Sequence, residues 1–490
     1  MAFSSPHTID AQQHCLLSNG SYSVMLDASG AGFSRWRDLA VTRWREDPTS
    51  NPWGTYLLLR DEESSAVWAA TQQPFGTRTP DDAVDFSPGR ARFSRRHHSV
   101  HSVLEIAVAA DADVELRRLT VSNHGDHTRT LSLTTYAELV LGPIGPDNAH
   151  PAFSKMFVQT EWDATHALLL ATRRRRDDNE AQIWAAHALQ VLGRPVDDGC
   201  SYETDRARWL GRNRTLRDAQ ALLPGAKLSN TTGCVLDPVF SLRQHFTLAP
   251  RESVTLLLWT RVADSRDGAF ALATQLADGE AATQLFAAAT PYATAMQTRT
   301  DMDEALATRS THWLGALLGN DPAQRAPAAD LARGHGGAPT LWAAGISGDR
   351  PIALVCVRDS AALTSVHDLL RAQRYWQQQH FAVDVVVLNR ARGSAADAVH
   401  AALAPLVDQQ HALLAQDAKA PRAELFVLRE DAIDAGLCAG LLTVARIVLH
   451  ANPAPPTPTA HAPAQDAASG MQAPIRATAV ADAATAAPAS

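Results

Sequence analysis

The sequence predicts a mainly β protein with an appended α/β domain. Runs with apolar residues at every second position fill residues 15–263, the pattern of antiparallel strands with one buried face. The apolar period becomes three to four residues over 264–330, and continuous apolar, β-branched runs alternate with helical segments over 331–450. We therefore expect a large antiparallel β-sandwich, a helical linker and a small parallel α/β domain, flanked by an N-terminal linker (1–14) and a tail (451–490).

Within the predicted sandwich, apolar pairs two residues apart define the strands. Tyr22, Val24 and Leu26 share one face, and the pairs at 114/116, 119/121 and 131/133 repeat the pattern. The segment LTVSNHGDHTRTLSLTTYAELVL contains two such runs, and residues 123–126 between them predict a β-hairpin. Residues 249–252 form the corresponding turn between the next two runs. Strands at this spacing favour a sandwich over a barrel enzyme.

The second half of the chain alternates helices and buried strands. The Ala- and Leu-rich linker predicts connecting helices that break near Gly279 and Pro291. PIALVCV and FAVDVVVLN are typical of buried parallel strands, and SAALTSVHDLLRAQRYWQQQH predicts the helix between them. More than half of the last forty residues are Ala and Pro, so we expect a disordered tail that cannot bury enough apolar surface to fold.

Composition narrows the class of protein. The 490 residues carry a formal net charge of −8, which argues against nucleic acid as a partner. The five cysteines are scattered without CxxC spacing, so we expect free thiols in a reducing compartment. The sequence shows neither a signal peptide nor an apolar run of about 20 residues. These features predict a cytoplasmic protein with no direct membrane span.

No motif independently predicts catalysis or a bound cofactor. Neither GxGxxG nor GxxxxGK[ST] is present, and GISGD before a strand predicts a turn. His97 and His101 would share one face of a strand as a potential metal pair, but no third ligand completes a site, and TRRRRDDNE predicts a solvated loop. GxSxG is missing as well, and no two carboxylates can be paired from sequence alone. We therefore predict no metal, no cofactor and no catalytic residue.

The segment FSRWRDLAVTRWREDPTSNPWG is the strongest local signal. Exposed tryptophans at 36, 44 and 53 would offer flat faces to a sugar, and neighbouring arginines would donate hydrogen bonds to its hydroxyl groups. Alternatively, the tryptophans cap the core, and Arg35, Arg37, Arg43 and Arg45 pair with Asp38, Glu46 and Asp47. Residue chemistry alone favours this packing interpretation.

The same segment carries a family resemblance. LLSNGSYSVMLDASGAGFSRWRDLAVTRWREDPTSNPWGTYLLLRD resembles the start of the β-supersandwich domain of family-94 glycoside phosphorylases, in the version found in cyclic β-1,2-glucan synthases. NHGDHTRTLSLTTYAELVL, AHPAFSKMFVQTE, YETDRARWLGRNRTLRD, VLDPVFSLRQHFTLAP and LWAAGISGDRPIALVCVRD continue it in order. The resemblance implies bacterial inner-membrane synthases (glycosyltransferase 36 type) with a UDP-glucose-dependent part and a phosphorylase part. In the latter an acid in an (α/α)6 barrel assists attack by phosphate.

For this chain the resemblance implies an accessory role. We expect a truncated or split product without the glucosyltransferase part and the barrel, which binds β-1,2-linked glucan. The predicted binding residues are Trp36, Arg37, Trp44, Arg45 and Trp53. Candidate partners are the other domains of a split synthase, which would bring the chain to the inner membrane, or a second copy in a homodimer. The alternatives are residual phosphorylase or glycosyltransferase activity at a cleft between the sandwich and the α/β domain, and a scaffold without a sugar role. Whether the chain is an enzyme stays open.

Overall fold

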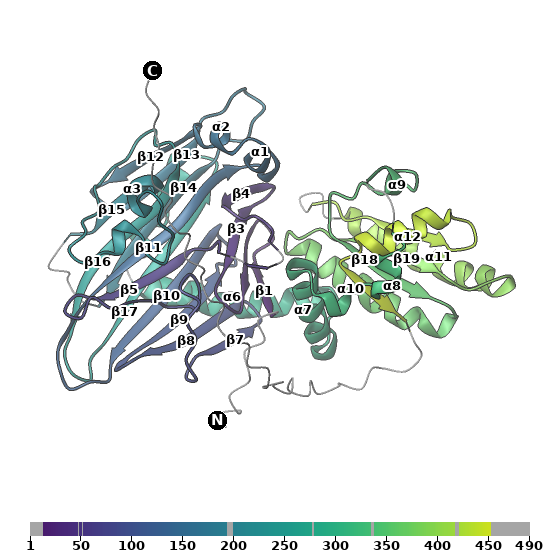
Figure 1. The fold of residues 1–490 in the computed structure, drawn as a ribbon, viewed down its shortest axis with the longest axis horizontal. Coiled ribbons are helices and arrows are strands. Elements are labelled where there is room, and N and C mark those ends of the chain that lie inside the picture. Colours follow the sequence, from purple (N-terminus) through teal and green to yellow (C-terminus); the bar gives the residue numbers. More distant parts are fainter. Residues whose placement is uncertain are drawn as a thin grey trace, which may run out of the picture. The chain divides into compact units, whose positions relative to one another are not determined.

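The computed structural model describes residues 13–47, 49–50, 52–193, 199–276, 279–334, 338–416 and 421–451. Within them the chain forms two large antiparallel sheets, several helices and one small parallel sheet (Figure 1). The predicted combination of a large antiparallel sandwich, helices and a parallel α/β part is therefore confirmed. The predicted linker up to residue 12 and the predicted tail beyond residue 451 lie outside the described residues.

The first sheet has nine strands in the described part of the chain. Their order is β1-β2-β3-β4-β11-β16-β15, with β5 also paired to β11 and β6 paired to β5. These strands are β1 (His14–Ser18), β2 (Tyr22–Asp27), β3 (Gly32–Trp36), β4 (Leu39–Thr42), β5 (Tyr56–Asp61), β6 (Val67–Ala69), β11 (Arg129–Gly142), β15 (Ser201–Asp205) and β16 (Pro238–Leu248). Helix α3 (Arg206–Leu210) and the 3₁₀ turn η1 (Gln220–Leu222) cover part of its outer face through a small apolar cluster.

The second sheet has eight strands among the described residues, in the order β12-β13-β14-β17-β10-β9-β8-β7. They are β7 (Ala83–Ser87), β8 (Arg90–His97), β9 (Val100–Val108), β10 (Val114–Asn123), β12 (Val158–Asp163), β13 (Leu168–Arg173), β14 (Trp184–Leu192) and β17 (Ser253–Ala263). Short helices α1 (Ile144–Ala149) and α2 (Pro151–Lys155) connect β11 to β12. Helices α4 (Arg266–Phe270), α5 (Ala273–Leu276) and α6 (Gly279–Arg299) pack on the outer face.

Strand β10 shows how burial on both faces sets the apolar pattern. Leu119 and Val121 lie in the core between the two sheets. Val114 and Leu116 lie in a second cluster with the buried side chains of α4–α6. Alternate residues of a strand face opposite sides, so the change from even to odd positions moves the apolar side chains from the outer to the inner face.

The two predicted hairpins are wrong. Strand β10 pairs with β9 and β17 in one sheet, whereas β11 pairs with β4, β5 and β16 in the other. The links β10–β11 and β16–β17 are therefore arches between the sheets. The Asn123 side chain joins them, since its Nδ2 donates to the carbonyl oxygens of His127 at 2.7 Å and of Leu248 and Ala249 at 3.2 Å. These bonds satisfy arch carbonyls that a hairpin ladder would otherwise satisfy.

The expected break at Pro291 is also wrong, because α6 continues through it to Arg299. A proline inside a helix costs about 3 kcal/mol relative to alanine. Phe286 and Met296 are buried on either side of Pro291, and each contributes about 1.5–3 kcal/mol. Tertiary packing therefore outweighs the local preference. The other expected break, near Gly279, falls next to residues 277–278, which lie outside the described residues, so it stays a prediction.

The α/β part is a parallel four-stranded sheet covered on both faces. Its order is β20-β19-β18-β21, from β18 (Ile352–Val357), β19 (Asp384–Asn389), β20 (Leu425–Arg429) and β21 (Ile447–His450). The apolar cluster on one face includes side chains of α7 (Glu304–Gly319), α10 (Leu363–Gln378) and α11 (Ser394–Ala415). The cluster on the other face includes α8 (Ala328–Leu331), α9 (Ala338–Trp342) and α12 (Ala435–Val444). The 3₁₀ turns η2 (Pro322–Gln324) and η3 (Ser360–Ala362) complete this part.

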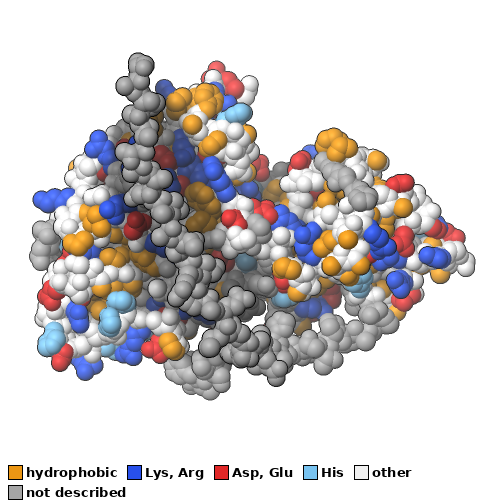
Figure 2. All heavy atoms as spheres, in the orientation of Figure 1, with side chains coloured by type: hydrophobic (Ala, Val, Ile, Leu, Met, Phe, Trp, Pro, Cys, Tyr) orange, Lys and Arg blue, Asp and Glu red, His pale blue; other side chains and the backbone are white. Residues whose placement is uncertain are grey.

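Two surface properties bear on function. On the face shown in Figure 2, acidic and basic side chains intermingle over the residues that the structure describes. No helix in these residues combines the length and the apolar character needed to cross a membrane.

Candidate functional site

The tight hairpin β3–β4 positions the first RWR triplet. Trp36 pairs with Leu39 across the hairpin, which leaves Arg37 and Asp38 as its two-residue turn. Arg37 has a φ of 53°, in the left-handed region that two-residue hairpin turns need. Trp36 consequently lies inside the protein, while Arg37 and Asp38 are exposed at the tip.

Trp36 anchors this hairpin to the second sheet. Its indole is 2% exposed, and its Nε1 donates to Asp113 Oδ2 at 2.6 Å. The Arg37 guanidinium lies 4.3 Å from the indole centre and so covers the ring. Asp113 Oδ1 accepts a further bond from Asn19 Nδ2 at 3.3 Å. The first tryptophan of the segment therefore has a structural position beneath the arginine that follows it.

We expect Trp36→Phe to lower the free energy of unfolding by about 2 kcal/mol, because Phe keeps the aromatic packing but cannot donate to the charged carboxylate of Asp113. Urea unfolding measures this difference. Trp342→Phe is the matched control, since that side chain is 59% exposed, and it should change stability by less than about 0.5 kcal/mol. Equal losses in the two variants would contradict the anchoring role.

Trp44 lines an open groove. Its half-buried ring lies 5.5 Å from the Phe33 ring at an interplanar angle of 59°. The groove has a volume of about 310 Å³, and the sandwich contributes Phe33, Arg35, Arg37, Asp38, Trp44 and Glu46 to its lining. The end of α7, residues 349–351, residues 380–382, Pro421 and Arg446 line the remainder. Arg446 Nη1 lies 2.5 Å from Glu46 Oε1, an ion pair within this lining.

The groove combines charges of both signs with an aromatic wall. Burial lowers the pKa of the Arg35 guanidinium, and the nearby carboxylate of Asp38 partly opposes that shift. Arg37 contributes a cationic group at the exposed tip of the hairpin. A polyhydroxylated ligand could accept hydrogen bonds from such guanidinium groups and donate to the carboxylates, while its C–H groups contact the rings.

Arg45 and Trp53 form another pair beside β3. The Arg45 guanidinium lies 5.8 Å from the Trp53 ring centre, and both side chains are half-buried. The Trp53 carbonyl accepts a bond from Gly32 N at 2.8 Å, which ties this segment to the start of β3. Among the predicted binding residues, the structure thus brings Arg37 and Trp44 to one groove and places Arg45 with Trp53 in a separate pair.

Arg43 belongs to a buried charged network that the sequence does not reveal. Its Nη1 lies 2.9 Å from Glu138 Oε2, and its Nε and Nη2 each lie 3.1 Å from an oxygen of Asp147. Arg43 and Asp147 are 2% and 0% exposed. Lys155 and Arg206 continue the network through Asp237, at 2.7 and 3.2 Å. The pairing of Arg43 with Asp38, Glu46 or Asp47 in the packing interpretation is therefore wrong.

The expected shared face of His97 and His101 is also wrong. The two residues lie on different strands, with His97 opposite Val100 and His101 opposite Arg96, so they face opposite sides of the sheet. The His97 ring stacks on Trp68 at 4.4 Å, and His101 Nε2 lies 2.9 Å from Ser94 Oγ. The described residues contain no group of three or more His, Cys, Asp or Glu side chains placed to hold a metal ion.

Comparisons with known proteins complement this geometry. The chain is 33% identical over 437 residues to the cyclic beta-(1,2)-glucan synthase NdvB of Rhizobium meliloti (strain 1021), an alignment that covers 89% of this chain and 15% of that protein. It is 25% identical over 223 residues to the N,N'-diacetylchitobiose phosphorylase of Vibrio proteolyticus, covering 44% of this chain and 26% of the relative. The chain therefore spans a minor part of each of these relatives.

A bacterial glucoamylase solved with acarbose gives a TM-score of 0.37 at 10% identity, covering 65% of this chain and 43% of its own; this likeness is too low to support an argument. The family model of the glycosyl hydrolase 94 supersandwich domain matches residues 2–279, which include both large sheets and the groove-lining segment of β3 and β4. The chain therefore belongs to the glycosyl hydrolase 94 supersandwich-domain family.

Proposed function

We propose that this chain is a carbohydrate-binding accessory protein that holds β-1,2-linked glucan in the groove beside Trp44. The observation that carries the proposal is the juxtaposition of the Phe33–Trp44 aromatic pair with Arg35, Arg37 and three carboxylates in one groove. Arg45, Trp53 and the buried Trp36 support the segment that forms the sandwich side of this groove.

The family and its relatives support the same conclusion at a coarser level. Membership of the supersandwich family and similarity to a glucan synthase and a chitobiose phosphorylase support a carbohydrate-related function. The β-1,2 linkage is proposed because the relative whose alignment covers 89% of this chain is a cyclic beta-(1,2)-glucan synthase. Binding without bond cleavage is proposed because the groove itself offers aromatic and hydrogen-bonding contacts, which recognise a glucan without any chemical step.

Trp44→Ala should weaken binding of linear β-1,2-glucan by about tenfold, which corresponds to the loss of about 1.4 kcal/mol of contact with one aromatic face. Isothermal titration of the purified full chain with linear and cyclic β-1,2-glucan measures the dissociation constant. Binding should persist when phosphate is absent, because no covalent step is involved.

Trp342→Ala provides the control, since it removes an exposed tryptophan on α9 that does not line the groove. It should leave the dissociation constant unchanged. Lack of glucan binding by the unsubstituted chain at millimolar concentration would refute the proposed function and favour a scaffold. Release of glucose 1-phosphate from glucan in the presence of phosphate would instead demonstrate phosphorylase activity.

A further inference from the structure

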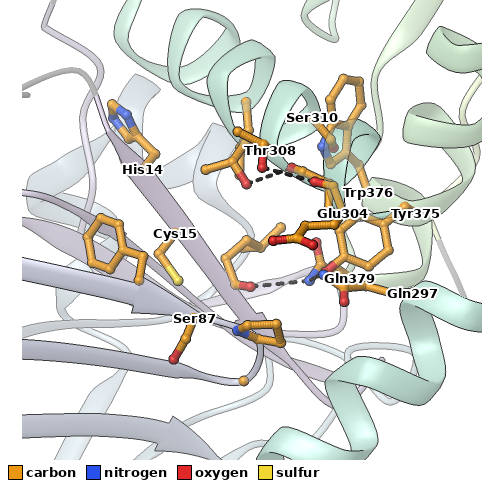
Figure 3. Close-up of a pocket in the computed structure, with 17 residues that line it drawn as sticks. His14, Cys15, Ser87, Gln297, Glu304, Thr308, Ser310, Tyr375, Trp376 and Gln379 are labelled. Atoms are coloured by element: carbon orange, nitrogen blue, oxygen red, sulfur yellow. Dashed lines mark hydrogen bonds between the residues drawn. The ribbon is translucent and has the colours of Figure 1, made fainter. Parts of the chain in front are cut away.

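A second, larger cavity lies beside the earlier part of α7, at residues 304–314, whereas the Trp44 groove meets the end of that helix. Its volume is about 520 Å³, within the range of about 300–1,000 Å³ that is typical of small-molecule sites. Strand β1, the turn between β7 and β8, helix α7 and the end of α10 supply its walls (Figure 3). No described residue lines both this cavity and the Trp44 groove, although α7 contributes different residues to each.

Hydrogen bonds fix the polar wall of this cavity. Gln379 Nε2 donates to the Leu16 carbonyl oxygen and to the Tyr375 hydroxyl, both at 3.2 Å. In Figure 3 the side chains of Gln379, Tyr375, Gln297 and Glu304 lie close together on one side of the cavity. Two amides, a phenol and a carboxylate are thus presented together from α6, α7, α10 and the residue that follows α10.

The lining is almost free of charge. Burial raises the pKa of the Cys15 thiol and of the Tyr375 phenol to about 12, so both groups are neutral at physiological pH. In the part of the chain that the structure describes, Glu304 is the acidic residue of the lining and His14 its basic residue, and neither Lys nor Arg contributes. A phosphate, a sulfate or a nucleotide would therefore find no guanidinium or ammonium group in this lining.

One hydroxyl group in the lining lacks a hydrogen-bond partner. Ser310 is 1% exposed, and its Oγ bonds to no other described residue. An unsatisfied buried hydroxyl is unfavourable, and a hydrogen-bonding ligand or a bound water would satisfy it. Phe86, Leu314 and Trp376 add apolar surface to the same lining.

We propose that this cavity is a separate binding site for a small neutral sugar. Amides, hydroxyls and a single carboxylate match the donors and acceptors of sugar hydroxyl groups, and the apolar side chains match its C–H groups. The site does not depend on the glucan groove at Trp44, so either one can exist without the other.

The test titrates the full chain with glucose and with the β-1,2-linked disaccharide sophorose, followed by ligand-observed NMR. Thr308→Trp places an indole at the exposed rim of the cavity and should weaken binding of both sugars at least tenfold. Thr298→Trp is the matched control, because both threonines are exposed helical residues whose Oγ1 donates to the carbonyl four residues earlier. Thr298 does not line this cavity and its variant should bind normally.

A second pair of variants keeps the test valid if Thr308→Trp does not fold. Glu304→Gln should weaken sugar binding three- to tenfold through loss of charge-assisted hydrogen bonds. Glu280→Gln, in the first turn of α6 as Glu304 is in the first turn of α7, should not. Unchanged sugar binding in both Thr308→Trp and Glu304→Gln would overturn the proposal, and so would preferential binding of choline over glucose. Trp44→Ala should leave glucose binding intact, which separates this result from failure of the glucan groove.

Discussion

Arg43→Ala is expected to lower the free energy of unfolding by about 3–5 kcal/mol, because it removes the arginine that pairs with the buried carboxylate of Asp147. It also removes one of the two arginines paired with Glu138, the other being Arg206. The cost comes mainly from the charges that remain, since Asp147 is 0% exposed and has no access to water in the folded state. Urea unfolding with linear extrapolation measures the difference, and the midpoint should fall without a change in slope.

Arg45→Ala is the matched control from the second RWR triplet. Arg45 is half-buried beside Trp53, so its removal should cost about 1 kcal/mol or less. Adding Asp147→Asn to Arg43→Ala should recover part of the loss, because it removes one uncompensated charge. Equal losses for Arg43→Ala and Arg45→Ala, or no recovery in the double variant, would show that the network does not stabilise the fold.

The sequence predicts the local structure of this protein better than its connections. Apolar residues at every second position identify β10 and β11 and their buried faces, since alternation follows from the geometry of a single strand. Alternation is the same whether two consecutive strands pair in one sheet or face each other across a core. The arch between β10 and β11 depends on Asn123 meeting the carbonyls of Leu248 and Ala249, more than 120 residues away. A local sequence pattern cannot predict a hydrogen bond between residues so far apart in the chain.

The same limit applies to the candidate site. The two RWR triplets have identical letters, yet their arginines have different surroundings: Arg37 covers Trp36, Arg43 is enclosed by carboxylates and Arg45 lies beside Trp53. The partners of Arg43 are 95 and 104 residues along the chain. Sequence reasoning therefore selects a segment that lines a groove, but only the fold decides which of its side chains reach that groove.

His187 should make the protein less stable in acid. It lies on β14, is 0% exposed, and stacks on Phe240 with ring centres 4.9 Å apart. Its ring nitrogens lie 2.9 Å from Thr260 Oγ1 and 3.2 Å from Thr135 Oγ1. Burial, with a smaller contribution from Arg117, lowers the pKa of His187 from 6.5 to about 3.

The unfolded chain therefore binds a proton at this residue below about pH 6.5, whereas the folded protein does so only near pH 3. Stability is complete above pH 6.5 and falls by about 1.4 kcal/mol per pH unit as the pH drops toward 3. Between pH 6 and pH 4 the loss from this residue is about 2.5 kcal/mol, and it stops growing below pH 3.

Unfolding free energies of the unsubstituted chain and of His187→Gln, measured from pH 4 to pH 7, isolate this contribution. Gln cannot take up the proton, so the variant should lose about 2.5 kcal/mol less stability than the unsubstituted chain between pH 6 and pH 4. His127→Gln is the control, because it removes a histidine whose side chain is 81% exposed instead of buried. Parallel curves for the chain and His187→Gln would contradict this prediction, because they would mean that His187 takes up its proton equally well in the folded core. The two threonine hydroxyls beside it are not expected to stabilise such a buried cation.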